Sequence, residues 1–404
     1  MNTLWTKDYT IITIGSIVSM LGNSMATFAI SLFVLDYTDT PTLYAVYLFL
    51  YTLPQIVAPV ISGPFVDRFS RKKTIYMLDF LSASMFFFMG CMVMLGKFSF
   101  FTLAVITFIN GVINSVYTVA FNSFYPMLIT EGNFQKAYAI SSTLEMVSYI
   151  TIPLATFLYK SIGITPVLFL DAFSYLAAAV FETQVGYNEE LHTQTYHLNT
   201  YIQDTKDGWN YLLSEKGILL ISLYISLGCS VDSISTVVTL PWFRASFDNG
   251  EYLYMIVWGG MALGRALGGL LHYRFKIPAH WKYTVALSVY LITSFNEAVY
   301  LYTSLPVMFL LMFLLGILSV TSNNIRTSST QSYVPSEIKG RYVGTFMMML
   351  TVGQLFGQAV AGFMISIFPL RETLVVSRLL LMLFAILIIG RGKKYIEPIY
   401  NRNV

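Results

Sequence analysis

The stretch "GPFVDRFSRKK", Gly63–Lys73, places a dense and mostly basic cluster of charges between two long apolar runs. The 404-residue chain as a whole is 56% hydrophobic and only 11% charged. Soluble globular proteins carry about a quarter of charged residues, so this composition excludes that class. The sequence therefore predicts a protein embedded in a membrane, with the charged cluster at a turn between two spans.

Apolar runs that are long enough to cross a bilayer as helices occur throughout the chain. Because these runs are continuous rather than alternating, they exclude the strands of a membrane barrel. The first run lacks the small-residue cleavage site of a secretory signal, and we expect it to remain in the protein. We predict an all-α membrane protein with twelve transmembrane helices at 10–35, 42–66, 74–95, 99–124, 137–160, 165–185, 217–243, 251–273, 283–303, 306–331, 341–368 and 373–390.

The distribution of Lys and Arg predicts the orientation of these spans. When the N-terminus is placed inside, most basic residues fall on cytoplasmic segments, as the positive-inside rule requires. We therefore expect a multi-pass protein of the cytoplasmic (inner) cell membrane with both termini in the cytoplasm. The basic loops are short and dispersed, which favours contact with anionic membrane lipid and not with nucleic acid.

The polar segment between the sixth and seventh spans divides the predicted helices six and six, and the two halves resemble each other at an offset of about 207 residues. "GPFVDRF" (Gly63–Phe69) aligns with "GLLHYRF" (Gly269–Phe275), and "INSVYTVAFNSFYP" (Ile113–Pro126) aligns with "SNNIRTSSTQSYVP" (Ser322–Pro335). The pattern predicts a duplication with a six-helix bundle at 1–186, a cytoplasmic central loop at 187–215, and a second bundle with a cytoplasmic tail at 216–404.

These features together resemble a known family. "GPFVDRFSRKK" is similar to the signature of the loop between helices 2 and 3 in the major facilitator superfamily, and Gly63, Asp67, Arg68, Arg71 and Lys72 fall on the motif positions. "VSMLGNS", "TLPQIVAP", "DGWNYLL" and "VPSEIKGR" resemble the macrolide-efflux-like branch, which includes drug exporters and siderophore exporters. The resemblance implies the major facilitator fold, alternating access, a functional monomer and no enzymatic activity.

The resemblance also implies that the opening motif is a gate on the cytoplasmic side. Gly63 would let its helix approach a neighbour closely, as small residues do in membranes. Asp67 would face the positive N-terminal end of the predicted helix 341–368. Tyr273 stands at the position that matches Asp67 in the second half, so we expect this gate to exist once.

Charged residues within spans are costly and usually functional, which makes them candidates for coupling transport to an ion. Asp232 is our first candidate, because a buried carboxyl there could take up and release a proton; the alternative is a permanent ion pair. Glu145 is the second candidate for coupling or for substrate binding, with a structural pair as its alternative. We expect Asp171, Glu297 and Arg378 to be structural.

Two further acids are predicted near the ends of spans. Asp79 is expected to join the charges of the loop that contains Gly63–Lys73, and Glu182 lies at the end of a predicted helix.

Polar side chains recur on single faces of several predicted spans. The family resemblance implies that the first, fourth, seventh and tenth spans line the transport cavity, and hydrogen bonding between helices is the alternative role for such faces. Arg326 is expected either to bind an anionic group of a substrate or, with slight preference, to pair with an acid. The candidate cavity residues are Asn23, Asn110, Asn114, Tyr117, Tyr149, Asn323, Asn324 and Arg326.

The sequence contains no phosphate-binding loop, metal-ligand cluster or nucleophile motif. We therefore expect no cofactor and no metal, and transport driven by an ion gradient, with protons as the predicted ion. The predicted function is export of a small amphipathic, drug-like organic molecule by proton antiport. The alternatives are an exporter of an anionic metallophore or siderophore that uses Arg326, a nutrient importer of the same fold, and a non-transporting membrane receptor.

Overall fold

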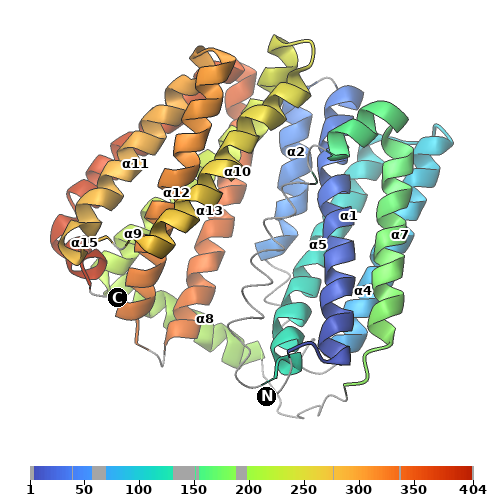
Figure 1. Cartoon of the computed structure of the whole chain (residues 1–404), viewed down its shortest axis with the longest axis horizontal. Coiled ribbons are helices and arrows are strands. Elements are labelled where there is room, and N and C mark those ends of the chain that lie inside the picture. The colour runs from blue at the N-terminus through green and yellow to red at the C-terminus, as the bar shows by residue number, and fades with distance from the viewer. Residues whose placement is uncertain are drawn as a thin grey trace. The chain divides into compact units, whose positions relative to one another are not determined.

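The computed structural model describes residues 4–38, 40–56, 70–130, 151, 154–187, 198–275, 277–335 and 338–402. All regular elements in these ranges are helices (Figure 1), and ten of them are long and apolar enough to cross a membrane. An all-helical, multi-pass membrane protein is thereby confirmed. The count of twelve stays a prediction, since the spans expected at 42–66 and 137–160 fall largely outside the described residues.

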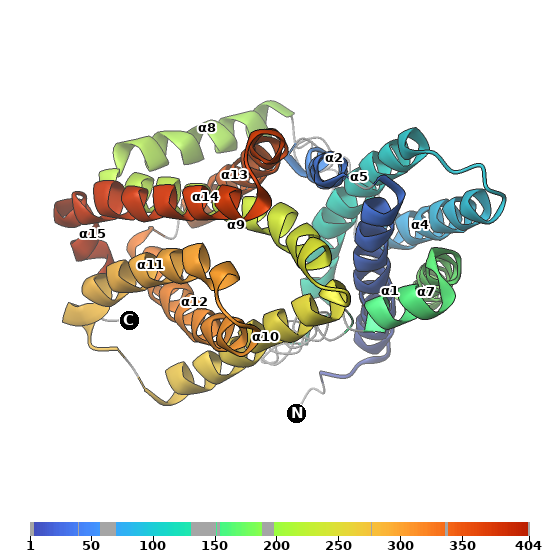
Figure 2. The same cartoon turned by 90° about the horizontal axis from the view of Figure 1, so that it is seen from above.

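The chain divides into two compact units, Met1–Leu198 (the first unit) and Asn199–Val404 (the second unit). In the first unit α1 and α4 both pack against α7, and α5 packs against α2 and α4 (Figure 2). The α2–α5 contact is close, because a Cβ on Gly111 would lie 2.4 Å from the carbonyl oxygen of Tyr51. The elements of this unit are α1 (Lys7–Thr38), α2 (Pro41–Thr52), α4 (Arg71–Met94), α5 (Phe100–Phe124), the 3₁₀ helix η1 (Tyr125–Leu128), helical residues 154–162 and α7 (Ile164–Thr183).

Serine caps fix where two of these helices begin. The Ser70 hydroxyl accepts a hydrogen bond from the backbone N–H of Lys73, and the Ser99 hydroxyl accepts one from the N–H of Thr102. A side-chain acceptor at this position satisfies one of the free N–H groups of the first turn. The caps therefore place Arg71, Lys72 and Lys73 in the first turn of α4.

All regular elements in the described residues of the second unit are helices. Its helices α10 and α12 pack together along their length, as do α9 and α13. The elements are α8 (Leu198–Ser214), α9 (Lys216–Ser246), α10 (Gly250–Arg274), η2 (Ala279–Trp281), α11 (Lys282–Val299), η3 (Tyr300–Tyr302), α12 (Leu305–Tyr333), α13 (Lys339–Ile367), α14 (Leu370–Phe384), the π-helical turn η4 (Ala385–Gly390) and α15 (Lys393–Tyr400).

Glycine residues allow close packing in both helix pairs, α10 with α12 and α9 with α13. A Cβ on Gly264 of α10 would lie 2.0 Å from the backbone oxygen of Phe313, and one on Gly357 of α13 would lie 2.0 Å from the backbone oxygen of Ser230. Small residues allow such backbone contacts between helices in membranes. Gly264 and Gly357 therefore let the backbones of the paired helices come into direct contact.

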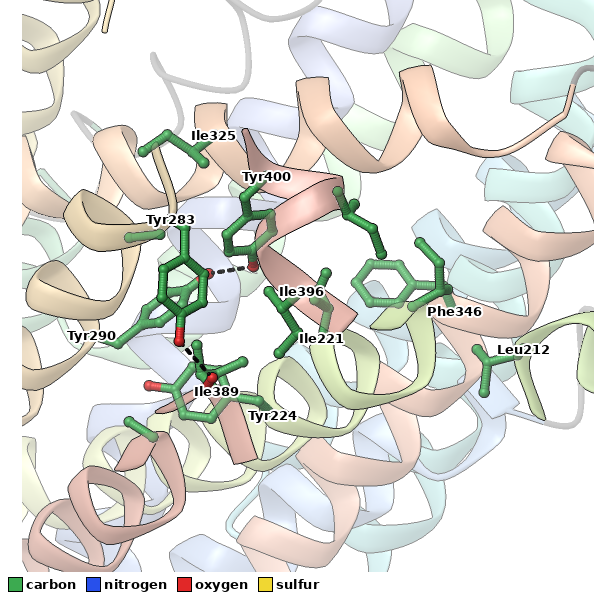
Figure 3. Close-up of a cluster of buried hydrophobic side chains, with 14 of the residues drawn as sticks. Leu212, Ile221, Tyr224, Tyr283, Tyr290, Ile325, Phe346, Ile389, Ile396 and Tyr400 are labelled. Atoms are coloured by element: carbon green, nitrogen blue, oxygen red, sulfur yellow. Dashed lines mark hydrogen bonds between the residues drawn. The ribbon is translucent and has the colours of Figure 1, made fainter. Parts of the chain in front are cut away.

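The helix α15, near the end of the described residues, is part of the core of the second unit. Tyr400 of α15 is fully buried, and its hydroxyl lies 3.0 Å from that of Tyr290 on α11 (Figure 3). The Tyr283 hydroxyl donates to the carbonyl of Ile389, 2.9 Å away. The predicted tail is thus a helix packed into the bundle, and the predicted central loop contains the helix α8, whose Asp207 forms a 3.1 Å ion pair with Arg341 of α13.

Candidate transport sites

The first unit contains a cavity of about 220 Å³ between α1, α4, α5 and α7, which we call the first-unit cavity. Four of the predicted cavity residues line it together: Asn23, Asn110, Asn114 and Tyr117. The helical spacing of the last three, at i, i+4 and i+7, places them on one face of α5. The other lining residues are Ser16, Ile17, Ser19, Met20, Asp79, Ser82, Ile113, Thr118, Phe121 and Tyr175.

The wall of this cavity is amphipathic. The Asn114 amide donates to the Tyr51 hydroxyl at 3.1 Å, which fixes the amide, and the rings of Tyr117 and Phe121 stack with centroids 5.9 Å apart. No Lys or Arg lies among its described lining residues. Aromatic faces with a few oriented polar groups suit a ligand that is largely apolar.

Two acids meet beside the first-unit cavity. Asp79 of α4 lines it and is 1% exposed, and Glu182 of α7 is 0% exposed. The two carboxyl groups lie within hydrogen-bonding reach of each other, and neither forms an ion pair with any described residue. Asp79 was expected to join the charges of the loop before α4; Asp67 and Arg68 of that loop lie outside the described residues, and the described ionisable partner of Asp79 is Glu182.

Close helix packing and nearby hydroxyl groups surround this acid pair. A Cβ on Gly15 of α1 would lie 3.2 Å from Oε1 of Glu182, so α1 closes over the carboxyl. The hydroxyl group of Tyr117 is buried close to both acids, and the hydroxyl groups of Ser16 and Ser19 lie beside it. Sequence reasoning missed this site, since both acids stand near the ends of predicted spans, where charges are ordinary.

Asp171 is a third buried acid among the described residues of the first unit and is 1% exposed. The Ser174 hydroxyl, one turn further along α7, donates to its Oδ1 at 3.3 Å. A Cβ on Gly22 of α1 would lie 2.7 Å from the same oxygen. These contacts agree with the structural role that we expected for Asp171.

The second unit contains its own cavity of about 360 Å³ between α9, α10, α11, α12 and α14, which we call the second-unit cavity. Its charged lining residues are Asp232, Arg265, Glu297 and Arg378. Nη2 of Arg378 lies 2.9 Å from Oδ1 of Asp232 and also forms an ion pair with Glu297. It donates as well to the Ser235 hydroxyl at 2.6 Å.

The side chains of this charge cluster differ in exposure. The Arg378 side chain is 4% exposed and that of Glu297 is 14% exposed, whereas that of Asp232 is 67% exposed. Asp232 is therefore not the buried carboxyl that its coupling role presupposed, and the structure shows the alternative, an ion pair. Arg378 and Glu297, each of which we expected to be structural, form an ion pair with each other and also line the cavity.

The predicted cavity residues of α12, Asn323, Asn324 and Arg326, are not among the lining residues of the second-unit cavity. Nη2 of Arg326 donates to Oδ1 of Asn323 at 2.5 Å, and its guanidinium stacks 5.3 Å from the ring centroid of Phe346. Over the described ranges Arg326 pairs with no acid, which contradicts the preferred expectation. Asn323 and Asn324 are exposed, and neither lines the second-unit cavity, whereas Ser322 does.

Several predicted residues cannot be compared with the structure. Glu145 and Tyr149 lie outside the described residues, as do Gly63, Asp67 and Arg68 of the gate motif.

The two remaining gate residues lie at the start of α4. Nη1 of Arg71 lies 3.7 Å from the sulfur of Met127, and Nζ of Lys72 donates to the carbonyl of Val185 at 2.5 Å. In the part of the chain that the structure describes, no cluster of three or more His, Cys, Asp or Glu side chains could hold a metal ion.

The family assignment follows from comparison with known proteins. Residues 12–354 match the Major Facilitator Superfamily. The chain belongs to this superfamily. Its members are transporters and not enzymes.

Named relatives and solved structures agree with this assignment. Macrolide efflux protein A of Streptococcus pyogenes is 22% identical over 274 residues, and the match covers 66% of each chain, just under two thirds of that relative. The nucleoside transporter NupG has a TM-score of 0.69 at 13% identity and covers 96% of this chain and 99% of its own. A bacterial homologue of the iron transporter ferroportin, in an inward-facing state, has a TM-score of 0.70 at 15% identity, covering 96% and 100%. These two structures share the major facilitator fold with this chain.

Proposed function

We propose that this superfamily member exports small amphipathic organic molecules across the cytoplasmic membrane by alternating access, in exchange for protons. The first-unit cavity carries the proposal: amide groups and stacked aromatic rings line it, an acid lies at its edge, and its described lining includes no basic residue. Such a wall favours apolar or cationic cargo over anions. The relative in Streptococcus pyogenes is named for the efflux of macrolides, which makes macrolides the first cargo to test.

The test is accumulation of a radiolabelled macrolide and of a panel of fluorescent lipophilic dyes in efflux-deficient cells, with and without a protonophore. We expect the wild-type chain to lower accumulation of at least one compound, and the protonophore to abolish this effect. Unchanged accumulation of every compound would reject drug export. Uptake in place of efflux would support the nutrient importer.

A matched pair of variants in α5 tests the role of the cavity. Asn110 lines the cavity, while the adjacent Ile109 is 40% exposed and does not line it. Asn110→Trp fills part of a space of about 220 Å³ and should abolish export, whereas Ile109→Trp should leave export near the wild-type level. Equal effects of the two variants would mean that cargo does not pass through this cavity.

A second candidate function is export of an anionic metallophore or siderophore. Arg326 supports it, because the contacts of its guanidinium are an amide and an aromatic ring, both neutral, and no acid of the described chain pairs with it. Arginine binds carboxylates well through its planar fork of donors. If Arg326→Ala stops the release of an endogenous anionic chelator while Asn110→Trp leaves drug accumulation unchanged, this second candidate replaces the first.

A further inference from the structure

Asp79 and Glu182 form an acid pair that is buried and without a described cation. Both oxygen atoms of Glu182 and Oδ2 of Asp79 have no hydrogen-bond donor among the described residues. The two side chains are 1% and 0% exposed, and they come from two different helices, α4 and α7. An unpaired carboxylate in such a place loses its hydration and gains nothing in return.

The groups that face this pair are neutral or acidic. Helix α5 contributes the hydroxyl group of Tyr117, which lies close to both acids and beside Ser16 and Ser19 of α1, and α7 contributes that of Tyr175, near Asp79. Helix α7 also contributes Asp171, whose negative charge would repel that of Asp79, as the charge of Glu182 would.

Two charged residues nearby are engaged elsewhere. Lys72, at the start of α4, donates to the carbonyl of Val185 and forms no ion pair with either acid. Asp8 of α1 accepts a hydrogen bond from the N–H of Gly186 at 2.8 Å. No described cation therefore neutralises the pair.

Two adjacent carboxyl groups in this environment cannot both be ionised without a large cost. Burial disfavours the charged form of each, and repulsion between like charges adds to that cost. A shared proton removes both penalties, since it converts one acid into a donor and lets the other accept a short, charge-assisted hydrogen bond. Such a pair titrates as a unit.

We infer that the Asp79–Glu182 pair is the site at which this transporter binds the proton that it exchanges for cargo. The inference rests on the proposed function and assigns its coupling step to the first unit, in place of Asp232. Asp79 lines the first-unit cavity, whereas Glu182 is not among its lining residues. A proton from the cavity would reach Asp79 first and then be shared with Glu182.

The same placement links the proton to cargo. A cationic or strongly polar group of a ligand in the first-unit cavity would lie beside Asp79 and stabilise its ionised form. Cargo binding would then favour release of the proton, and proton binding would favour release of the cargo. This mutual exclusion is the requirement for antiport, and it needs no conformational assumption beyond alternating access.

The test measures the protonated carboxyl directly, by infrared difference spectroscopy of the purified full-length protein in lipid nanodiscs as the pH is raised, with no cargo present. We expect the wild type to lose a protonated-carboxyl band reversibly. The double variant Asp79→Asn/Glu182→Gln should abolish this change, and Asp171→Asn, an equally buried acid of α7, should retain it. Each single variant should shift the pH of the transition, because the two acids are coupled.

Two spectroscopic results would overturn the inference: a pH-dependent band that survives in the double variant, or single variants that titrate like the wild type. Gel filtration and circular dichroism check that the near-isosteric amide variants fold, and the two single variants replace the double variant in this test if the double variant does not fold.

The transport assay tests the proposed function independently of the spectroscopy. If the wild type exports nothing, the proposed function fails even where the carboxyl band behaves as expected; if the wild type exports a macrolide in a protonophore-sensitive way and the double variant does the same, the coupling assignment fails.

Discussion

The two units of this transporter differ in whether their acidic side chains have a cation as a partner. In the second unit, Asp232 and Glu297 surround Arg378, so the acids have a cation within ion-pair distance. In the first unit, the described surroundings of Asp79 and Glu182 are each other, the acid Asp171 and neutral hydroxyl groups, and they include no cation paired with either acid. Acids that form ion pairs with a cation have their charge compensated by that cation, whereas an acid pair without a cation needs a proton. The partner of a carboxyl, and not its depth in the bundle, indicates whether it can carry a proton.

The largest expected effect comes from removing Arg378, which forms ion pairs with both acids of the second-unit cavity. Arg378→Met leaves Asp232 and Glu297 as neighbouring acids with only Arg265 in the same cavity lining and should destabilise the protein by about 3–5 kcal/mol. Thermal unfolding of purified protein in detergent measures it. If the two units differ as described, Glu182→Gln, which removes an acid from the acid pair, should change stability far less and in the stabilising direction.

Arg371 provides a control on the same helix. Its guanidinium stacks on the rings of Trp242 and Tyr302, with centroids 4.9 and 4.7 Å away. Arg371→Met should cost about 0.5–1 kcal/mol, the usual value of such contacts at exposed sites. Equal losses for Arg371→Met and Arg378→Met would contradict the view that the Arg378 cluster is the main electrostatic support of the second unit.

The helical spans and one polar face of the cavity could be predicted from the sequence, because both depend on local periodicity. The expected spans 74–95 and 217–243 correspond to α4 (Arg71–Met94) and α9 (Lys216–Ser246). The face formed by Asn110, Asn114 and Tyr117 follows from helical spacing alone and lines a cavity as expected.

The pairing of charges could not be predicted in the same way. Asp79 meets Glu182, and Asp232 meets Arg378, only because particular helices pack together at a particular axial register. That register depends on backbone contacts at residues such as Gly15, whose partner is distant in sequence. Helical periodicity gives the face of a charge but not the helix that it faces, so Asp232 was favoured over the acid pair.

Glycine substitutions test whether the two units also differ in how rigidly their helices are packed. In the second unit Gly357 faces a backbone oxygen of Ser230, which cannot move aside, while in the first unit Gly15 faces the flexible end of Glu182, 3.2 Å from its added Cβ. We expect Gly357→Ala to cost about 1–3 kcal/mol and Gly15→Ala clearly less. Thermal unfolding tests this, with Gly228→Ala as the control, since a Cβ at Gly228 meets nothing within 4 Å. A Gly15→Ala loss as large as that of Gly357→Ala would show that the acid pair is rigidly held.

The pH dependence of stability should separate the units further. A folded state that keeps a proton on the Asp79–Glu182 pair binds more protons than an unfolded chain, in which both acids are solvated and ionised. Stability should then fall as the pH rises, by up to about 1.4 kcal/mol per pH unit for one proton. The double variant Asp79→Asn/Glu182→Gln should flatten this slope, and Asp232→Asn should not. Unfolding temperatures between pH 6 and pH 9 measure the slopes, and parallel curves for wild type and double variant would exclude a retained proton.

The smallest expected effects come from a feature that both units share. Each contains a buried pair of tyrosine hydroxyl groups: Tyr9 and Tyr125 at 2.8 Å in the first unit, and Tyr290 and Tyr400 at 3.0 Å in the second. Tyr9→Phe and Tyr290→Phe should each cost about 1 kcal/mol, because each leaves one buried hydroxyl without its partner. Double-mutant cycles on each pair isolate the coupling energy from the loss of the hydroxyl itself.

The coupling energies of the two tyrosine pairs also determine how the stability changes of Arg378→Met and Glu182→Gln are interpreted. Coupling energies that agree within about 0.5 kcal/mol would mean that neutral hydrogen bonds contribute alike in the two units. The contrast between Arg378→Met and Glu182→Gln would then be a property of charge alone, as the proton-binding role of Asp79 and Glu182 requires. A coupling energy in the first unit near zero, beside a normal value in the second, would instead indicate a first unit that is loosely packed throughout. In that case the small effect of Glu182→Gln would reflect weak packing, and it could not be used as support for a shared proton.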